Sequence, residues 1–248
     1  MKPARIIRIL VYFIIAVNFF LIGFLISQHT GKAVYDENIE YANITKIIDG
    51  DTLDTDIGRV RLLGINTPEK KEKGWEEAKS FLENYNNRQV KLIYFYEDKD
   101  KYDRKLRYVF YNNENINKKI IEQGLAHIYY YNNDNYKQEL ETAEEKARKN
   151  KLGIWEKSKN VCADCIMLKE LNSVDPGEFV ILENICNFNC NLNLWIIKDD
   201  ASNKKTLNFT ILANENYKID YEGRVWNDAG DSLYLRDKEG FLVIFYRY

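Results

Sequence analysis

The chain has 248 residues, of which 45% are hydrophobic and 30% charged, and this ordinary globular composition excludes a wholly disordered or collagen-like protein. Glycine (12) and proline (3) are scarce, so long flexible linkers are not expected. The formal net charge of −2 means that no global positive field attracts nucleic acid. Any site for a polyanion must therefore be local.

An apolar run occupies residues 9–27, with Lys2, Arg5 and Arg8 before it. A helix of this length, at about 1.5 Å per residue, just spans a hydrocarbon core of about 30 Å. The basic residues favour a cytoplasmic N-terminus. We therefore expect residues 1–40 to form a transmembrane signal-anchor and a tether that hold the rest of the chain outside the cell. Cleavage of the anchor, followed by secretion, is the alternative.

Short alternating or β-branched runs, separated by Asp-Gly and Ile-Gly turns, begin at Tyr41 and give way to stretches with helical spacing of apolar residues. Asn115 is a suitable N-cap for one of these helices, and Gly124 suits its C-terminus. We expect strands over 41–48, 51–57, 59–65, 89–97, 106–112 and 126–131, and helices over 71–85, 116–124 and 136–150.

The character of the chain changes after the cysteine pair at 162 and 165. Residues 171–248 carry 8 Lys and Arg against 12 Asp and Glu, or −4, whereas residues 41–170 carry 24 against 23, or +1. Strands recurring at roughly ten-residue spacing predict a small β-sandwich, in which Trp195 is a core residue rather than a ligand platform. We expect strands over 178–184, 193–199, 206–212, 216–222, 232–237 and 241–247.

Three polar segments of the first region stand out from its apolar runs. The turn at 49–52 brings two carboxylates to one place, and Asn66–Glu69 forms a polar loop directly after a strand. Arg61 lies inside an apolar run, so it needs an anionic ligand or an ion-pair partner. The last polar segment, 100–104, is either a functional loop or a solvated hairpin end.

The order of these segments carries a family resemblance. The sequence reads DGDT, RLLGINTPE, DKYDR, INKKIIEQGLA and finally LGIW, and over Tyr41–Trp155 it resembles the staphylococcal nuclease (thermonuclease-like) family. The resemblance implies a five-stranded OB-type barrel with three helices that cleaves phosphodiester bonds of DNA and RNA with calcium. OB barrels bind their ligands on one face and its flanking loops.

The resemblance also implies catalytic roles for single residues. Arg61 and Arg104 match the family's two phosphate-clamping arginines, whose guanidinium groups donate in bidentate fashion to phosphate oxygens. Glu69 matches the carboxylate that orients or deprotonates the attacking water. Tyr102 and Tyr130 match tyrosines that line the nucleotide pocket. The structural alternative is a barrel without chemistry, in which Arg61 only forms an ion pair with Asp51 or Glu69.

The implied metal ligands are Asp51, Thr67 through its backbone carbonyl, and Asn66, all oxygen donors that suit calcium. Asn66 departs from the family, which has aspartate there, so we expect weaker calcium binding or the use of another divalent ion. Asp103 is a second departure, since the family has glycine before the clamping arginine. Its carboxylate is expected to pair with Arg104 and reduce the pull of this arginine on phosphate.

The C-terminal region resembles the lamin-tail domain family, an immunoglobulin-like sandwich, over Ile166–Tyr248. The resemblance rests on Glu178–Val180, the strand with Trp195, and Asn227–Asp231. It implies a binding or spacing role without chemistry, and the partner is not identified. The acidic balance argues against direct binding of nucleic acid by this region.

Four cysteines, Cys162, Cys165, Cys186 and Cys190, form two close pairs in the sequence. An even number in an exported chain predicts two disulfides, and the sequence leaves three pairings open. A structural zinc site with four thiolates is the alternative. The two histidines, His29 and His127, have no partner at ligand spacing, so a histidine-based nuclease is not expected.

These observations together predict a mostly β, α+β chain. It has an anchor over residues 1–40, a nuclease-like OB domain over 41–158 and a lamin-tail-like sandwich over 159–248. The predicted function is a membrane-anchored, outward-facing endonuclease that acts on DNA or RNA with little sequence specificity. The alternative is a catalytically inactive surface module that binds nucleic acid or protein.

Overall fold

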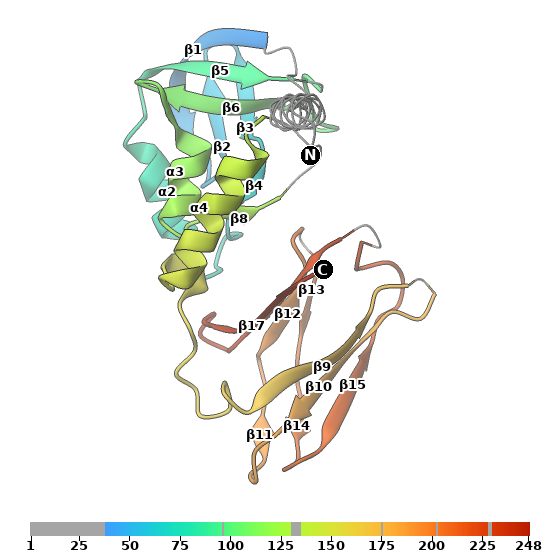
Figure 1. Cartoon of the computed structure of the whole chain (residues 1–248). Helices are drawn as coiled ribbons and strands as arrows, with labels where there is room; N and C mark the ends of the chain where they lie inside the picture. The colour runs from blue at the N-terminus through green and yellow to red at the C-terminus, as the bar shows by residue number, and fades with distance from the viewer. Residues whose placement is uncertain (1–37, 96, 130–134, 175, 202, 228–229) are drawn as a thin grey trace, which may run out of the picture. The chain divides into compact units, whose positions relative to one another are not determined.

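The computed structural model describes residues 38–95, 97–129, 135–174, 176–201, 203–227 and 230–248 (Figure 1). Residues 37–248 form one compact unit. The predicted membrane segment 9–27 and the predicted pocket residue Tyr130 lie outside the described residues. Across the described ranges, no helix is long and apolar enough to cross a membrane.

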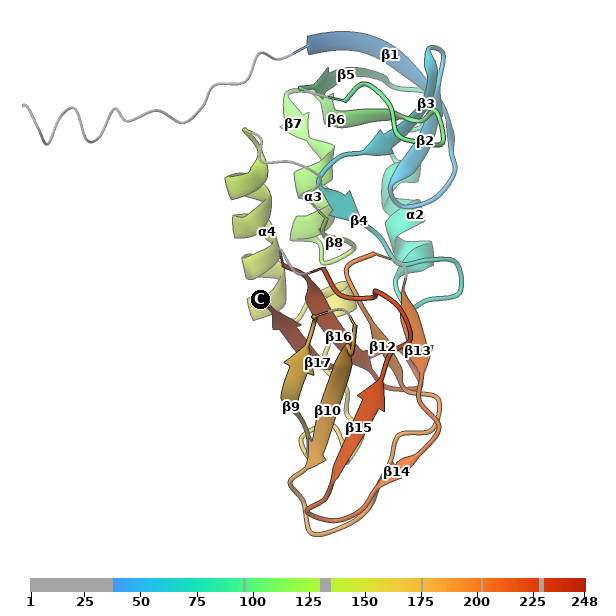
Figure 2. The same ribbon diagram turned by 90° about the vertical axis from the view of Figure 1, so that its right-hand side faces the viewer.

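Five strands of the described chain close into a barrel, which confirms the predicted OB-type fold (Figures 1 and 2). Their order is β3-β2-β1-β5-β6, with antiparallel neighbours, and a parallel pairing of β3 with β6 closes the barrel. The strands are β1 (Asn38–Ile47), β2 (Thr52–Thr55), β3 (Gly58–Leu62), β5 (Gln89–Tyr94) and β6 (Lys105–Tyr111), with the short β4 (Ile65–Asn66), β7 (Glu114–Asn115) and β8 (His127–Ile128) beside them.

The predicted strand 59–65 is divided in the structure, because Gly64 turns the chain between β3 and β4. Gly64 has φ +74°, and a Cβ there would lie 2.7 Å from Leu140 Cδ1 and 2.9 Å from the Tyr108 hydroxyl. Only glycine fits this close approach. The predicted strand 126–131 is reduced to β8 in the described part, and β8 pairs with β4 so that His127 lies opposite Asn66.

Three helices pack on the barrel, as the sequence predicts. α3 begins as expected at Asn115, whose side chain accepts a hydrogen bond from the Lys118 backbone N–H at 3.2 Å. α4 places Leu140, Ala143 and Ala147 on its buried face. The bounds are α2 (Trp75–Glu83), α3 (Ile116–Glu122) and α4 (Lys137–Lys149), followed by the 3₁₀ turn η1 (Gly153–Trp155).

The described C-terminal region consists of a three-stranded sheet, a four-stranded sheet and a two-stranded pair around a second core, hereafter the sandwich (Figure 2). Trp195 is 1% exposed, which confirms its predicted place in the core. One sheet has the order β15-β10-β9, the other β13-β12-β16-β17, and β11 pairs with β14. The bounds are β9 (Ile166–Asn172), β10 (Phe179–Asn184), β11 (Cys190–Asn191), β12 (Ile196–Lys198), β13 (Lys204–Thr206), β14 (Thr210–Ile211), β15 (Asn216–Asp220), β16 (Ser232–Arg236) and β17 (Leu242–Arg247).

A third apolar cluster joins the barrel to the sandwich. Trp155, the last residue of the LGIW motif, packs edge-on against Phe245 of β17, with ring centroids 5.1 Å apart. Tyr234 of β16 and Leu242 of β17 complete the cluster from the sandwich side. Because these side chains are withdrawn from water together, the two parts of the chain stabilise each other.

All four cysteines form disulfides, Cys162 with Cys190 and Cys165 with Cys186. The bonds therefore connect the two sequence pairs and do not close either pair on itself. The predicted disulfides are confirmed, and the zinc alternative is excluded, because a disulfide sulfur has no thiolate to offer a metal. The bonds tie the junction after the barrel to the first strands of the sandwich.

Removal of the Cys165–Cys186 bond should destabilise the sandwich. The bond closes a loop of 21 residues, and loops of this size restrict the unfolded chain by about 3 kcal/mol. We expect the Cys165→Ser, Cys186→Ser double variant to lose about 2–4 kcal/mol of unfolding free energy, measured by urea denaturation. An unchanged urea midpoint would contradict a structural role for this bond.

Candidate nuclease site

The DGDT turn and the loop after β4 meet at one buried carboxylate. Asp51 Oδ2 accepts hydrogen bonds from the Thr67 backbone N–H at 3.0 Å and from the Thr67 hydroxyl at 2.9 Å. Gly50 permits this approach, since a Cβ there would lie 2.9 Å from Thr67 Oγ1 and 2.6 Å from the Ala78 Cβ of α2. The turn is therefore more than a hairpin end, because it is packed against the predicted metal-binding loop.

Arg61 is buried beside this carboxylate. β2 and β3 pair so that Arg61 lies opposite Thr52, and its Nη2 is 3.2 Å from Asp51 Oδ2. Nη1 donates to the Leu62 carbonyl at 2.6 Å, and Nη2 also donates to Asn66 Oδ1 at 3.0 Å. A buried guanidinium needs such acceptors, and here they hold its plane in one orientation. The ion pair of the structural alternative thus exists with Asp51.

Asp49 is a carboxylate of the same turn to which the sequence analysis assigned no role. It is half-buried, and its Oδ1 accepts the Asp51 backbone N–H at 3.1 Å. Burial and then the negative charge of Asp51 raise the pKa of Asp49. The negative charge of Asp51 thus disfavours ionisation of Asp49, and a cation bound beside this turn would relieve that repulsion.

The donor set around this turn fits a hard divalent cation by type. Asp51, Asn66 and Asp49 supply carboxylate or amide oxygens, and Thr67 supplies a backbone carbonyl in the same loop. Among the described residues there is no group of three or more His, Cys, Asp or Glu side chains arranged for a metal. A cation here would therefore depend on neutral oxygens as well as on carboxylates.

Arg104 lies at the closing edge of the barrel, directly before the β6 residue Lys105 that pairs with β3. Its Nε and Nη2 are both 2.7 Å from Asp100 Oδ2. Burial opposes ionisation of Asp100, but the hydrogen bonds from Arg104 and from backbone N–H groups outweigh it, and the pKa is lowered. The exposed Tyr102 ring lies 5.4 Å from the Arg104 guanidinium carbon.

The expected pairing of Asp103 with Arg104 is wrong. Asp103 forms an ion pair with Lys99 at 2.7 Å, and the carboxylate on Arg104 is that of Asp100. Asp103 has φ +63°, in the left-handed region that favours glycine, which accounts for glycine as the family residue. Aspartate tolerates this conformation better than most residues, so the turn keeps its shape.

Glu69 is exposed at the end of the loop that carries Asn66 and Thr67. Its backbone N–H donates to Glu72 Oε2 at 3.1 Å, but within the described residues its own carboxylate makes no hydrogen bond or ion pair. The structure thus joins Asp51, Arg61 and the Asn66–Thr67 segment by direct contacts. It leaves Glu69 and Arg104 unconnected to them by any contact between the described side chains.

His127 belongs to the same region, although the sequence assigned it no chemistry. It is buried opposite Asn66, and its Nε2 is 2.9 Å from the Asp200 carbonyl of the sandwich. A carbonyl only accepts hydrogen bonds, so Nε2 carries the proton in the neutral ring. Burial, followed by the charge of Lys198, lowers the pKa of His127 to about 4.

Comparison with known proteins agrees with the barrel and its motifs. The family model described as "Staphylococcal nuclease homologue" matches residues 59–157. A thermonuclease of Staphylococcus intermedius is 37% identical over 138 residues, which cover 51% of this chain and 82% of the relative. A thermonuclease of Staphylococcus hyicus is 32% identical over 130 residues, 48% of this chain and 77% of the relative. Protein ParB of Escherichia coli is 32% identical over 125 residues, 45% of this chain and 70% of the relative.

The closed barrel, its three helices and the buried arginine at the DGDT turn define a nuclease-type OB barrel. With the similarity to both thermonucleases, the chain belongs to the staphylococcal nuclease family. Membership of this family indicates a nuclease, a hydrolase that binds nucleic acid.

The pKa of His127 predicts a pH dependence of stability. With a pKa of about 4 in the folded protein and 6.5 in the unfolded chain, the unfolded state binds more protons between these values. His127 therefore contributes stability above pH 6.5 that is lost as the pH falls to 4, about 3 kcal/mol in all. Lys198 and Arg247 favour the neutral ring, and Glu144 opposes them.

The measurement compares the wild type with His127→Gln, which keeps an amide donor but does not titrate. The wild-type free energy of unfolding minus that of the variant should fall by about 3 kcal/mol from pH 7 to pH 4. The difference is needed because burial raises the pKa of Asp199 to about 6, and this group has the opposite effect. A difference that does not change with pH would mean that His127 has the same pKa in the folded protein as in the unfolded chain.

Proposed function

We propose that this chain is a divalent-metal-dependent nuclease that hydrolyses phosphodiester bonds of DNA or RNA with little sequence specificity. The observation that carries the proposal is the buried Arg61 guanidinium, held by the carboxylate of Asp51 and the amide oxygen of Asn66. A fixed cation beside a set of oxygen donors is what a phosphodiester needs when negative charge develops on its oxygens.

The chain's own residues have separate roles in this proposal. Arg61 and Arg104 donate hydrogen bonds to phosphate oxygens, and Arg104 exchanges part of its contact with Asp100 for the substrate. Glu69 is exposed, and its carboxylate has no partner within the described residues, which suits a group that takes a proton from water. Tyr102, 68% exposed, offers a ring on which a base can stack.

Asp51, Asn66 and the Thr67 carbonyl would hold the metal, with Asp49 as a further carboxylate. Calcium is the proposed ion, and when bound it would supply positive charge next to the phosphate. The amide of Asn66 brings no charge, so weaker calcium binding, or use of another divalent ion, remains part of the proposal.

The proposed location is the outer face of a membrane, with an anchor over residues 9–27, and secretion after cleavage is the alternative. The apolar run supports the anchor, and the two disulfides are typical of an oxidising compartment. We propose the domains as residues 1–40, 41–158 and 159–248. The last of these is a lamin-tail-like sandwich whose partner the sequence does not identify.

The second candidate function is an inactive surface module that binds nucleic acid or protein. The ion pairs of Arg104 with Asp100 and of Arg61 with Asp51 favour it, because a guanidinium that is already paired has less to offer a phosphate. The Glu69 carboxylate, which has no partner in the part of the chain that the structure describes, favours the enzyme, since a purely binding surface gains nothing from such a negative charge facing a polyanion.

Substitution of Glu69 distinguishes the nuclease from the inactive binding module. The full chain should cleave single-stranded DNA and RNA with calcium and stop when EDTA is added. Glu69→Gln should lower the cleavage rate about 10²–10⁴-fold through loss of the base, with little change in stability at this exposed position. Glu170→Gln, an exposed glutamate of β9, is the matched control and should cleave like the wild type.

The binding module would be favoured if the folded wild-type chain cleaved neither DNA nor RNA with calcium, magnesium or manganese. Equal rates for the wild type and Glu69→Gln would show that cleavage uses another base.

A further inference from the structure

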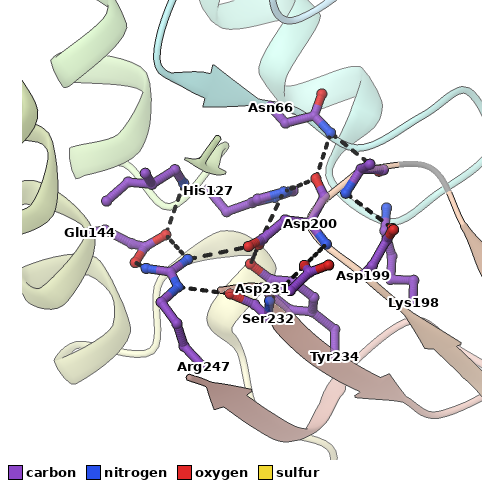
Figure 3. A network of polar contacts seen from close by, with 12 residues as sticks. Asn66, His127, Glu144, Lys198, Asp199, Asp200, Asp231, Ser232, Tyr234 and Arg247 are labelled. Atoms are coloured by element: carbon purple, nitrogen blue, oxygen red, sulfur yellow. Dashed lines mark hydrogen bonds and ion pairs between the residues drawn. The ribbon is translucent and has the colours of Figure 1, made fainter. Parts of the chain in front are cut away.

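The turn between β12 and β13 lies directly on the Asn66 end of the nuclease site (Figure 3). The Asp200 carbonyl accepts hydrogen bonds from Asn66 Nδ2 at 3.1 Å and from His127 Nε2 at 2.9 Å. The Ala201 carbonyl accepts a second one from Asn66 Nδ2 at 3.4 Å. The pairing of β4 with β8 places the two donors side by side, so one pair of short strands holds one turn of the sandwich.

These contacts determine which way the Asn66 amide faces. Main-chain carbonyls only accept hydrogen bonds, so the NH₂ group of Asn66 must face Asp200 and Ala201. The guanidinium of Arg61 only donates, so Oδ1 must face Arg61 on the other side. The sandwich therefore turns the oxygen of Asn66 toward the arginine and the Asp51 carboxylate, where the proposed metal ligands gather.

Aspartate at position 66 would have no donor for the carbonyls of Asp200 and Ala201. A carboxylate oxygen in the place of Nδ2 would lie about as close to the Asp200 carbonyl as the amide nitrogen does now, and neither group could donate. The departure from the family's aspartate thus coincides with the contact between the barrel and the sandwich. Asparagine offers the turn a donor and the site an oxygen at the same time.

Hydrogen bonds within the sandwich fix Asp199, Asp200 and Ala201, so this part of the turn can support Asn66. Asp199 Oδ1 accepts the backbone N–H groups of Ala201 and Asn203, both at 3.0 Å. The Asp200 backbone N–H donates to Asp231 Oδ1 at 3.2 Å, and the Asp200 carboxylate accepts the Tyr234 hydroxyl at 2.7 Å. Residues of the sandwich therefore hold both Asp200 and Ala201, whose carbonyls accept the hydrogen bonds from the barrel.

An ion pair between Arg247 and the buried Glu144 carboxylate holds the turn against the barrel. Arg247 Nη1 of β17 lies 2.6 Å from Glu144 Oε2 of α4, and the other oxygen of Glu144 accepts the Ile128 backbone N–H of β8 at 2.9 Å. The Glu144 side chain is 2% exposed, so the pair is strong only while the two parts remain in contact. Figure 3 shows this pair next to the Asp200 contacts.

We propose that the sandwich is a working part of the nuclease site: the Asp200–Ala201 turn, with His127, positions Asn66 so that its oxygen serves the metal. Asn66 has a second role in this proposal, since its amide donor keeps the barrel and the sandwich in contact. The first half rests on the proposed function, whereas the second half concerns docking alone and can be tested without any catalysis.

The first experiment compares Asn66→Asp with the wild type in the full chain. Asn113→Asp, the same chemical change in an exposed turn, is the matched control. We expect Asn66→Asp to become at least about 10-fold more sensitive to limited proteolysis between residues 156 and 165, because the turn loses its donor while the carbonyls remain. Asn113→Asp should be cleaved like the wild type. Wild-type resistance in Asn66→Asp would overturn the docking role.

The second experiment tests positioning with His127, which we place outside the catalytic and metal-binding groups. His127→Phe removes the other donor to the Asp200 carbonyl. Loss of a residue that orients a metal ligand weakens metal affinity about 10–100-fold, so calcium binding measured by calorimetry should weaken by about 10-fold or more. His127→Gln, which can still donate, should bind calcium within about 3-fold of the wild type.

Saturating calcium should restore most of the cleavage rate of His127→Phe, because the ligands themselves are intact. A merely structural role predicts instead a lower rate at every calcium concentration with unchanged affinity, and that result would overturn the positioning role. If the wild type binds calcium but does not cleave, the proposed function fails, and the calorimetry and proteolysis still decide the inference.

Discussion

The rest of the site depends on the contacts that the buried Arg61 guanidinium makes with three acceptors. Its acceptors come from the Leu62 carbonyl, Asp51 and Asn66, which belong to three neighbouring segments of the barrel. A charge removed from water is tolerated only when it is fully paired, so each segment must hold its place for the fold to be stable. The same requirement leaves a fixed cation next to oxygen donors before any substrate arrives, which is the arrangement that lowers the barrier to phosphoryl chemistry.

Asn66 links this site to the second half of the chain. Its oxygen faces Arg61 and its nitrogen faces the sandwich, so the amide is shared between two sets of contacts. The apolar packing of Trp155 on Phe245 and the ion pair of Arg247 with the buried Glu144 carboxylate hold the sandwich in the position that this sharing requires. An accessory β-sandwich that contacts a residue beside Arg61 differs from a spacer, because it provides the acceptors for the Asn66 amide nitrogen.

Much of the barrel could be predicted from local patterns, as the cap at Asn115 illustrates, whereas the turn at Gly64, inside the predicted strand 59–65, could not. The ion-pair partners of charged side chains were harder to predict from the sequence. Asp103 was expected on Arg104, yet the turn directs it to Lys99 and places Asp100 on the arginine instead. The five charged side chains within residues 99–104 allow several pairings, and only the backbone path of the turn selects among them. The pairing of the cysteines could not be predicted for the same reason, since four cysteines allow three pairings.

The sequence by itself determined the family, the barrel and the residue types of its site, because these depend on hydrophobic period, turn residues and motifs that lie within short stretches of chain. Only the tertiary structure decided what Asn66 and His127 do. Their common acceptor is the Asp200 carbonyl, 134 residues beyond Asn66. Every residue has a backbone carbonyl, so no residue type in the sequence indicates that the carbonyl of Asp200 is the acceptor. It becomes a partner only when folding brings the turn of the sandwich onto the barrel.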